Sequence, residues 1–237
     1  MIARASRAYY NEFDPFAAQW LRNLIDAGHI APGDVDDRSI EDVTADDVRG
    51  YTQAHFFAGI GLWSLALRMA GVSDDEEVWT GSCPCQPFSH AATAGRKMTE
   101  DSRDLFPTWL RLIAARRPRV VYGEQAPVAS WIDRAASDLE ALGYEVGAGV
   151  VPALVVGADH LRRRVYFAGY ANGYRESVGS VHAEASRMSW PVRNPEPVSA
   201  EDGDTCRMAR LRAYGNAIVP QVAAAFIQAA EEARYAA

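Results

Sequence analysis

Residues 54–70 read Ala-His-Phe-Phe-Ala-Gly-Ile-Gly-Leu-Trp-Ser-Leu-Ala-Leu-Arg-Met-Ala, and this stretch decides the fold class. The apolar run 54–58 predicts a short strand, and from Leu62 onward apolar residues recur at helical spacing. Gly59 and Gly61, between the two, let the backbone approach a ligand, and the helix start offers free N–H groups. This order predicts a nucleotide-type cofactor at the carboxyl edge of a sheet, although a plain tight turn would have the same pattern.

The rest of the chain continues the alternation of strands and helices. We expect strands over 5–11, 78–81, 119–123, 150–156 and 164–168, and helices over 15–27, 105–115, 129–142 and 218–236. The alternation predicts an α/β fold, with a doubly wound, mostly parallel sheet that helices cover on both faces. Residues 171–205 are polar and lack periodicity, so we expect a small irregular lobe or a long functional loop there.

The composition bounds the class of protein. The 237 residues can bury a full core as one domain, and no apolar run approaches the ~20 residues that span a bilayer. Residues 1–10 contain no apolar leader segment, so we expect a monomer in the cytoplasm without a membrane partner. Cys83, Cys85 and Cys206 are too few for a disulfide framework, and Cys-Pro-Cys is too tight for a zinc knuckle. Reduced thiols and no metal are expected.

The charge is unevenly distributed. The net charge is −7, from 24 basic and 31 acidic residues, and most of the acidic excess lies before residue 96. Arginines cluster at 116–119, 162–164 and 207–212, and arginine is the side chain suited to bidentate contacts with phosphates and base edges. Genomic base composition can produce the same arginine bias, so charge alone does not predict a nucleic-acid partner.

Pro84-Cys85-Gln86 is a sharper pattern. It follows the predicted strand 78–81, so the prolines around Cys85 aim an exposed thiol from the end of a strand. Such a thiol becomes a nucleophile when its pKa is lowered or a base lies nearby. The alternative is a buried structural cysteine, which the flanking prolines and the lack of a surrounding apolar run disfavour.

Two further patterns flank this cysteine in the predicted sheet. Glu124 follows the strand 119–123, which brings a carboxyl group to the same edge as Cys85, where it could protonate a ring nitrogen. By itself it could equally be a solvated charge or a helix cap. Arg162 and Arg164 lead into the next strand and should point together, with Arg163 pointing away. Solvated arginines are the alternative to phosphate or base contacts.

The last pattern is Gly-Asn-Ala-Ile-Val-Pro at 215–220. Pro220 suits the first turn of the C-terminal helix, and capping explains Asn216 without any ligand. Taken in order, however, five patterns resemble the cytosine-C5 DNA methyltransferase family, in which a Phe-x-Gly-x-Gly turn, Pro-Cys-Gln, Glu-Asn-Val, Gln-x-Arg-x-Arg and Gly-Asn-x-x-x-Pro follow one another. Here they lie at 57–61, 84–86, 124–126, 160–164 and 215–220, and the likeness covers nearly the whole chain.

The resemblance implies an S-adenosylmethionine-dependent methyltransferase with a Rossmann-like sheet, and double-stranded DNA as its partner. It implies that a thiolate adds to C6 of a flipped-out cytosine and that a carboxyl group protonates N3. The implied catalytic residues are Cys85, Glu124, Arg162 and Arg164. The implied cofactor-binding residues are Glu12, Phe13, Ser39, Ile40, Phe57, Gly59, Gly61, Pro84 and Asn216. The implied DNA-binding residues are Gln86, Ser89, Arg96, Lys97, Arg103 and Arg163, of which those in 89–103 belong to a segment expected to close over the base.

Three departures from the family pattern matter. The acidic–aromatic pair of the second motif, Glu12-Phe13, precedes the glycine turn, as does 38–43, which resembles the third motif. Those two strands would lie together at one edge, so the cofactor site need not move. Gln125-Ala126 and His160 replace residues that orient neighbours more than they react. The resemblance divides the chain into a catalytic domain 1–170, a reduced recognition region 171–208, and a segment 209–237 that returns to the catalytic domain.

Other functions share parts of this pattern. An RNA (tRNA) cytosine methyltransferase would carry the same motifs, and the short recognition region keeps this alternative open. A catalytically inactive DNA-binding homologue would not need the pair Cys85 and Glu124. An NAD-dependent oxidoreductase is supported only by the glycine turn, where Ser64 occupies the position of a third glycine. A compact enzyme of this type would suit a phage or a restriction-modification setting.

Overall fold

The structure is a computed structural model that describes residues 7–84, 104–158, 160–173 and 217–236. Its centre is a seven-stranded sheet in the order β2-β1-β3-β4-β5-β7-β6. The strands are β1 (Ala8–Asn11), β2 (Gly33–Asp36), β3 (Gln53–Phe56), β4 (Val78–Gly81), β5 (Val120–Gln125), β6 (Tyr144–Pro152) and β7 (Arg163–Ala171). The first five are parallel, and β7 is antiparallel to both of its neighbours.

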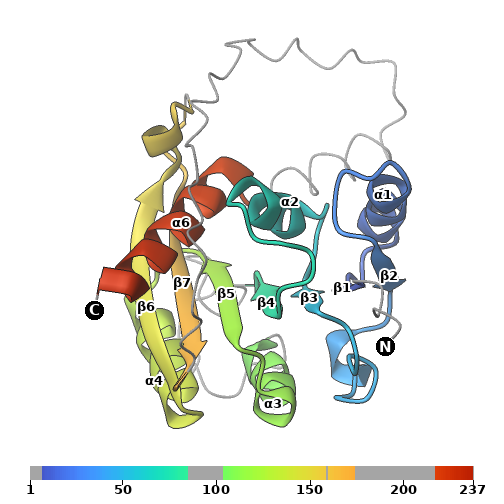
Figure 1. The fold of residues 1–237 in the computed structure, drawn as a ribbon, viewed down its shortest axis with the longest axis horizontal. Coiled ribbons are helices and arrows are strands. Elements are labelled where there is room, and N and C mark those ends of the chain that lie inside the picture. The colour runs from blue at the N-terminus through green and yellow to red at the C-terminus, as the bar shows by residue number, and fades with distance from the viewer. Residues whose placement is uncertain (1–6, 85–103, 159, 174–216, 237) are drawn as a thin grey trace, which may run out of the picture.

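Helices cover both faces of this sheet, as the alternation predicts (Figure 1). One face packs against α1 (Pro15–Asp26), α2 (Leu62–Met69) and α6 (Pro220–Ala236). The other face packs against α3 (Phe106–Arg116), α4 (Ala129–Ala141) and the short 3-10 turn η1 (Ile40–Asp42). The result is a doubly wound α/β fold with a mostly parallel, Rossmann-like sheet.

The order of the strands along the chain is permuted relative to their order in space. β1 and β2 come first in the sequence, yet they form the edge of the sheet beside β3, the strand that leads into the glycine turn. Asn11 pairs with Phe56 across this boundary, and Glu12 follows Asn11 at the same end as the glycine turn. The expectation that the two early strands lie together at one edge is confirmed.

The expected strand 150–156 is wrong at both of its bounds. The expected strand 150–156 ends at Pro152, and the four residues that follow it form the 3-10 turn η3 (Ala153–Val156). Proline cannot donate to a sheet ladder, which is why the strand stops there. The same strand begins earlier than expected, at Tyr144, and pairs along its whole length with β7.

Within the described ranges, no helix is both long enough and apolar enough to cross a membrane.

Candidate active site

The glycine turn between β3 and α2 is held in left-handed backbone conformations. Phe57, Gly59 and Gly61 have φ angles of 52°, 56° and 80°. Only glycine adopts this region at little cost, so the conformation of Phe57 is strained, and such strain is typical of functional turns. The two glycines differ in surroundings. A Cβ on Gly59 would meet nothing within 4 Å, whereas one on Gly61 would press against Ile30 and Leu21. Gly61 therefore serves packing, and Gly59 leaves space for a ligand.

Glu12 links the end of β1 to this turn. One of its carboxylate oxygens accepts a hydrogen bond from the Gly59 N–H at 2.7 Å, and the other accepts from the Asp14 N–H at 2.9 Å. Burial raises the pKa of this carboxyl group, while the two backbone hydrogen bonds oppose that rise. Each carboxylate oxygen keeps a further lone pair for a ligand hydroxyl. Phe13, next in the chain, is 71% exposed, so its ring is free to stack.

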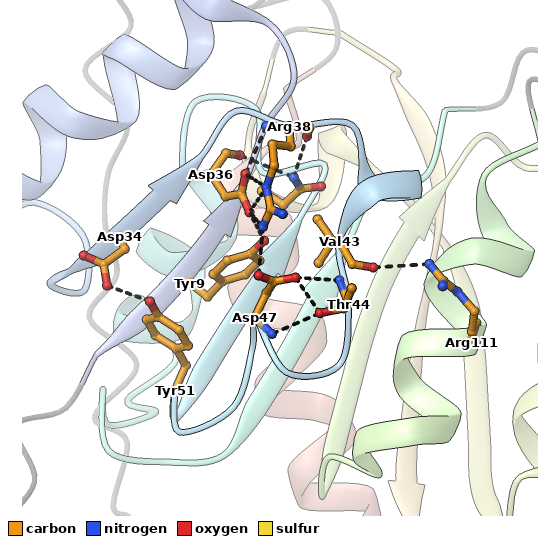
Figure 2. A network of polar contacts seen from close by, with 10 residues as sticks. Tyr9, Asp34, Asp36, Arg38, Val43, Thr44, Asp47, Tyr51 and Arg111 are labelled. Carbon is orange, nitrogen blue, oxygen red and sulfur yellow. Dashed lines mark hydrogen bonds and ion pairs between the residues drawn. The ribbon is translucent and has the colours of Figure 1, made fainter.

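The segment that resembles the third motif forms a braced turn after β2. Asn11 Nδ2 donates to the Arg38 carbonyl at 2.9 Å, and the Tyr9 hydroxyl donates to Asp36 at 2.6 Å. Arg38 pairs with Asp36 at 2.6 Å and with Asp47 at 3.1 Å, and Figure 2 shows these side chains converging on one another. The network fixes the backbone that leads into Ser39 and Ile40.

Ser39 and Ile40 differ in what they could offer a ligand. The Ser39 hydroxyl oxygen accepts from the Glu41 N–H at 3.3 Å and caps η1. The Ile40 side chain is 3% exposed and belongs to the core beneath α3. Ile40 was expected to line the cofactor site. Its side chain is committed to packing, so only its backbone is left for that role.

Glu124 is the penultimate residue of β5 and is 6% exposed. Its Oε1 atom lies 2.9 Å from Nε of Arg164, on β7. Burial raises the pKa of Glu124, and this rise is opposed by the charges of Arg164 and Arg162 and by a hydrogen bond from Ser82. The expectation that Arg162 and Arg164 point together is confirmed, and Arg163 between them is exposed.

The end of β4 lies beside Glu124, because Gly81 pairs with Gly123. Three residues follow it before the described part stops, namely Ser82, Cys83 and Pro84. The Gln125 side chain donates from Nε2 to the Cys83 carbonyl at 2.9 Å, so the residue that replaces the family's asparagine orients the chain leading into Cys85. Burial raises the pKa of the Cys83 thiol well above its usual range. Cys83 therefore stays protonated and does not compete as a nucleophile.

The remaining expected site residues lie outside the described residues. They are Cys85, Gln86, Ser89, Arg96, Lys97, Arg103 and Asn216. Within the described ranges, no group of three or more His, Cys, Asp or Glu side chains is arranged to hold a metal ion. Two site residues carried no motif. The Ser82 side chain bonds Glu124 and accepts a hydrogen bond from Trp63. These contacts arise because the sheet and α2 bring the residues together, and no local spacing in the sequence signals them.

Three of the solved structures that are similar to the chain share 15–16% identity with it. They are the Dnmt2 methyltransferase of S. pombe (16% identity, 76% of this chain and 58% of that one, TM-score 0.43), a putative prophage-encoded DNA modification methyltransferase from E. coli (16%, 70% and 47%, 0.42), and the Entamoeba histolytica methyltransferase EhMeth (15%, 74% and 56%, 0.40). The chain thus spans 47–58% of the length of these proteins.

None of the curated proteins compared with the chain is significantly similar to it. The family model described as C-5 cytosine-specific DNA methylase matches residues 72–203, which is more than half of the chain. That match contains β4, the Pro84-Cys85-Gln86 sequence, Glu124 and the three consecutive arginines that precede and begin β7. The chain belongs to the C-5 cytosine-specific DNA methylase family, which takes its methyl group from S-adenosylmethionine.

Proposed function

We propose that this chain is a DNA (cytosine-5-)-methyltransferase, which methylates C5 of a cytosine flipped out of duplex DNA through a covalent adduct with Cys85. One observation carries the proposal. Glu124 is a buried carboxyl group paired with Arg164, at the carboxyl end of β5 and beside the strand end that leads into Cys85. A carboxyl group with a raised pKa, beside the strand end that leads into a candidate nucleophile, suits acid catalysis on a pyrimidine ring.

The residues at the glycine turn fit S-adenosylmethionine. The open space in front of Gly59 admits a ligand, the free lone pairs of Glu12 suit ribose hydroxyls, and the exposed Phe13 ring suits the adenine. Ser39 lies at the same edge on the braced turn after β2, and Pro84 lies beyond β4. When bound, this cofactor supplies an electrophilic methyl group on a sulfonium centre.

The chain's own groups make the base reactive. The Cys85 thiolate donates an electron pair to C6 of the cytosine, which forms the S–C6 bond and moves the electrons of the C5–C6 double bond into the ring. Glu124 gives its proton to N3, so the charge that develops on the ring is neutralised and C5 becomes nucleophilic. After methylation, loss of the C5 proton to a base restores the double bond and releases the Cys85 thiolate, and the N3 proton returns to Glu124.

Arg164 and Arg162 hold this acid in place in different ways. Arg164 contacts the Glu124 carboxyl group directly, and it turns another guanidinium nitrogen back to the Arg163 carbonyl at 2.8 Å. Arg162 donates to the Ala217 carbonyl at 2.8 Å, which ties the site to the residue that follows Gly215-Asn216 in the chain. Two positive charges beside Glu124 stabilise its anion once the proton has moved to the base.

The proposed division of the chain follows the packing. α6 packs on α2 and on the sheet through Val222, Ala223 and Ile227, which supports the proposal that the segment 209–237 returns to the catalytic domain 1–170. The proposed recognition region 171–208 lies outside the described residues from 174 onward. Arg163 is exposed, which supports the proposal that it contacts a phosphate. Unstacking the target base costs roughly a few kcal/mol, which contacts of this kind would offset.

Bisulfite sequencing of DNA from cells that express the protein tests the proposal. We expect methylated cytosines at a defined sequence, and none when Cys85 is replaced by alanine. Incubation with methyl-labelled cofactor and either duplex DNA or tRNA separates the two nucleic acids, and label in tRNA alone would overturn the DNA assignment. Duplex DNA containing 5-fluorocytosine should trap a covalent adduct, because fluorine cannot leave as the C5 proton does. Binding without an adduct would show that the chain is a DNA-binding protein without this chemistry.

A further inference from the structure

A short chain of hydrogen bonds reaches Glu124 from the far side of β4. The Trp63 indole Nε1 lies 3.0 Å from the Ser82 hydroxyl oxygen, and the Ser82 side chain in turn bonds Glu124. Trp63 is 2% exposed and is the second residue of α2, while Ser82 directly follows β4. The hydrogen bonds thus join α2, the segment after β4 and β5 in a line.

The direction of each bond in this line is determined by chemistry. An indole N–H can only donate, so the Ser82 oxygen must accept from Trp63. Serine has a single hydroxyl proton, and the bond with Trp63 does not use it. An ionised Glu124 carboxylate can only accept, so in that state the Ser82 proton is directed to it. Ser82 is oriented as a donor, and a donor favours the ionised form of the carboxyl group that accepts from it.

Ser82 differs from the other groups that face Glu124. Arg164 and Arg162 approach from the β7 side and carry charge, and Tyr166, opposite Glu124 on β7, keeps a neutral hydroxyl because burial raises its pKa. Ser82, on the β4 side, is uncharged and aimed by a fixed partner. Removing its hydroxyl leaves the charge of the site unchanged, so the consequence for Glu124 can be measured separately from that of the arginines.

We propose that Ser82 and Trp63 are positioning residues that hold the Glu124 carboxyl group in place and set how readily it gives its proton to the cytosine ring. The inference rests on the proposed role of Glu124 as the acid. Trp63 lies two residues after Gly61, so the helix that starts at the glycine turn also carries the group that aims Ser82. The cofactor end and the acid end of the site are therefore joined through one turn of α2.

Titration of Glu124 in the full chain, without nucleic acid or cofactor, tests the proposal directly. The carboxyl signal is followed by NMR with labelled glutamate and assigned by its absence in Glu124→Gln. We expect Ser82→Ala to raise the pKa of Glu124 by about 1, since a hydrogen bond to the anion is lost. Ser82→Thr, which keeps the hydroxyl, should restore the wild-type value. Trp63→Phe should raise the pKa by less, because Ser82 is present but no longer aimed.

Trp109→Phe is the matched control for the indole. Trp109 is fully buried, and among the described residues its Nε1 atom has no hydrogen-bond partner, so its loss should leave the pKa of Glu124 unchanged. The pH profile of methyl transfer should move with the titration in each variant. An unchanged pKa in Ser82→Ala, or an equal rise in Trp109→Phe, would overturn the inference. Because the titration needs no substrate, a wild-type protein that shows it but transfers no methyl group refutes the proposed function instead.

Discussion

Glu12 and Glu124 invite comparison, because they lie at the same edge of one sheet and burial raises the pKa of both. Glu12 follows β1, and Glu124 is the penultimate residue of β5, with β3 and β4 between the two strands. Their partners differ. Glu12 accepts from two backbone N–H groups, which cannot move or titrate. Glu124 accepts from side chains, namely the guanidinium of Arg164 and the hydroxyl of Ser82.

The difference in partners indicates a different role for each carboxyl group. Backbone donors hold Glu12 as a fixed acceptor, which is what recognition of ligand hydroxyls requires. Side-chain donors from different parts of the sheet keep the protonated and ionised forms of Glu124 close in free energy. Burial favours the protonated form, and the arginines favour the anion. A group that gives up a proton in the reaction needs that balance. One edge of the sheet thus has a binding end and a proton-transfer end.

The largest effect should come from Cys85→Ala. We expect methyl transfer to fall by roughly 10⁴-fold or more, because the nucleophile is lost, while cofactor affinity at the Glu12 end is unchanged. Label incorporation and calorimetric titration with S-adenosylmethionine measure the two quantities. Cys83→Ala is the control, and it should retain most activity because the Cys83 thiol stays protonated and buried. Parallel loss of transfer and affinity in Cys85→Ala would point to a structural cysteine.

Glu124→Gln should remove the proton donor and keep the shape. We expect kcat to fall by roughly 10²–10³-fold, with cofactor affinity unchanged. In the wild type the rate should decline as the pH rises through the raised pKa of Glu124, since the acid form is lost. The variant should lack that decline. A pH–rate profile that keeps the same falling limb in Glu124→Gln would assign the acid to another residue.

Glu12→Gln should have the reverse pattern. The Glu12 carboxylate has two acceptor oxygens, whereas the amide of glutamine has one. Two backbone N–H groups and two ribose hydroxyls would then share a single acceptor oxygen, so we expect cofactor affinity to fall by roughly 10- to 100-fold. The rate at saturating cofactor should change little. Equilibrium binding and steady-state kinetics separate the two, and the exposed Glu41, changed to Gln, provides a control. A fall in kcat with unchanged affinity would show that Glu12 does not act in cofactor binding as distinct from proton transfer.

His55, on β3 between the two carboxyl groups, should limit stability in acid. Burial lowers its pKa to about 3, and its Nδ1 atom lies 2.8 Å from the Thr80 hydroxyl. The unfolded chain binds this proton near pH 6.5, so below that pH the unfolded state binds more protons and stability falls as the pH falls. From about pH 7.5 to about pH 5.5 the loss should be about 1.4 kcal/mol.

His55→Asn should remove this part of the pH dependence, because the amide can replace the bond to Thr80 without titrating. Urea unfolding at several pH values, followed by tryptophan fluorescence, gives the difference between the two proteins. The variant will have a lower stability at neutral pH through lost packing against Tyr10, which stacks on the imidazole at 4.8 Å. Equal slopes in the two proteins would show that His55 titrates normally in the fold.

The smallest effect should come from Arg163→Ala. The side chain is exposed, so we expect DNA affinity to fall a few-fold and the dependence of log affinity on log salt to lose about one unit of slope. The rate with saturating DNA should be unchanged. Binding measured over a range of salt concentrations tests this. A loss of kcat would instead show that Arg163 takes part in the proton transfer with Glu124.

Much of the fold could be predicted from local pattern. β4 has the predicted bounds, and α1, α2, α3 and α4 lie within a residue or two of theirs. The second early strand was expected only from the family resemblance, and local pattern did not predict the bounds of β2, because Gly33-Asp-Val-Asp has one apolar residue and forms a half-exposed edge strand whose pairing with β1 is not local. The start of β6 was missed for a similar reason, since Gly147 and Gly149 interrupt an exposed edge strand.

The site could be predicted as far as motifs reach. Glu124, Arg162 and Arg164 were proposed from the period of two in a strand and from the edge at which the strand before Glu124 ends, and the structure brings the three side chains together. The line from Trp63 to Glu124 could not be found in this way. It depends on how α2 lies across β4, which is set by side-chain packing between residues 19 positions apart. The packing role of Gly61 is likewise invisible until Leu21 and Ile30 are placed against it.

The permuted strand order also has a consequence for synthesis. β1 is made before β3, the strand that joins it to the rest of the sheet in the described ranges, so for about 40 residues of translation β1 presents an open edge on that side. The ion pairs among Asp36, Arg38 and Asp47 join residues that are all made in this interval. They provide a locally formed brace, and the acidic side chains that dominate this stretch discourage pairing with other nascent chains until β3 is made.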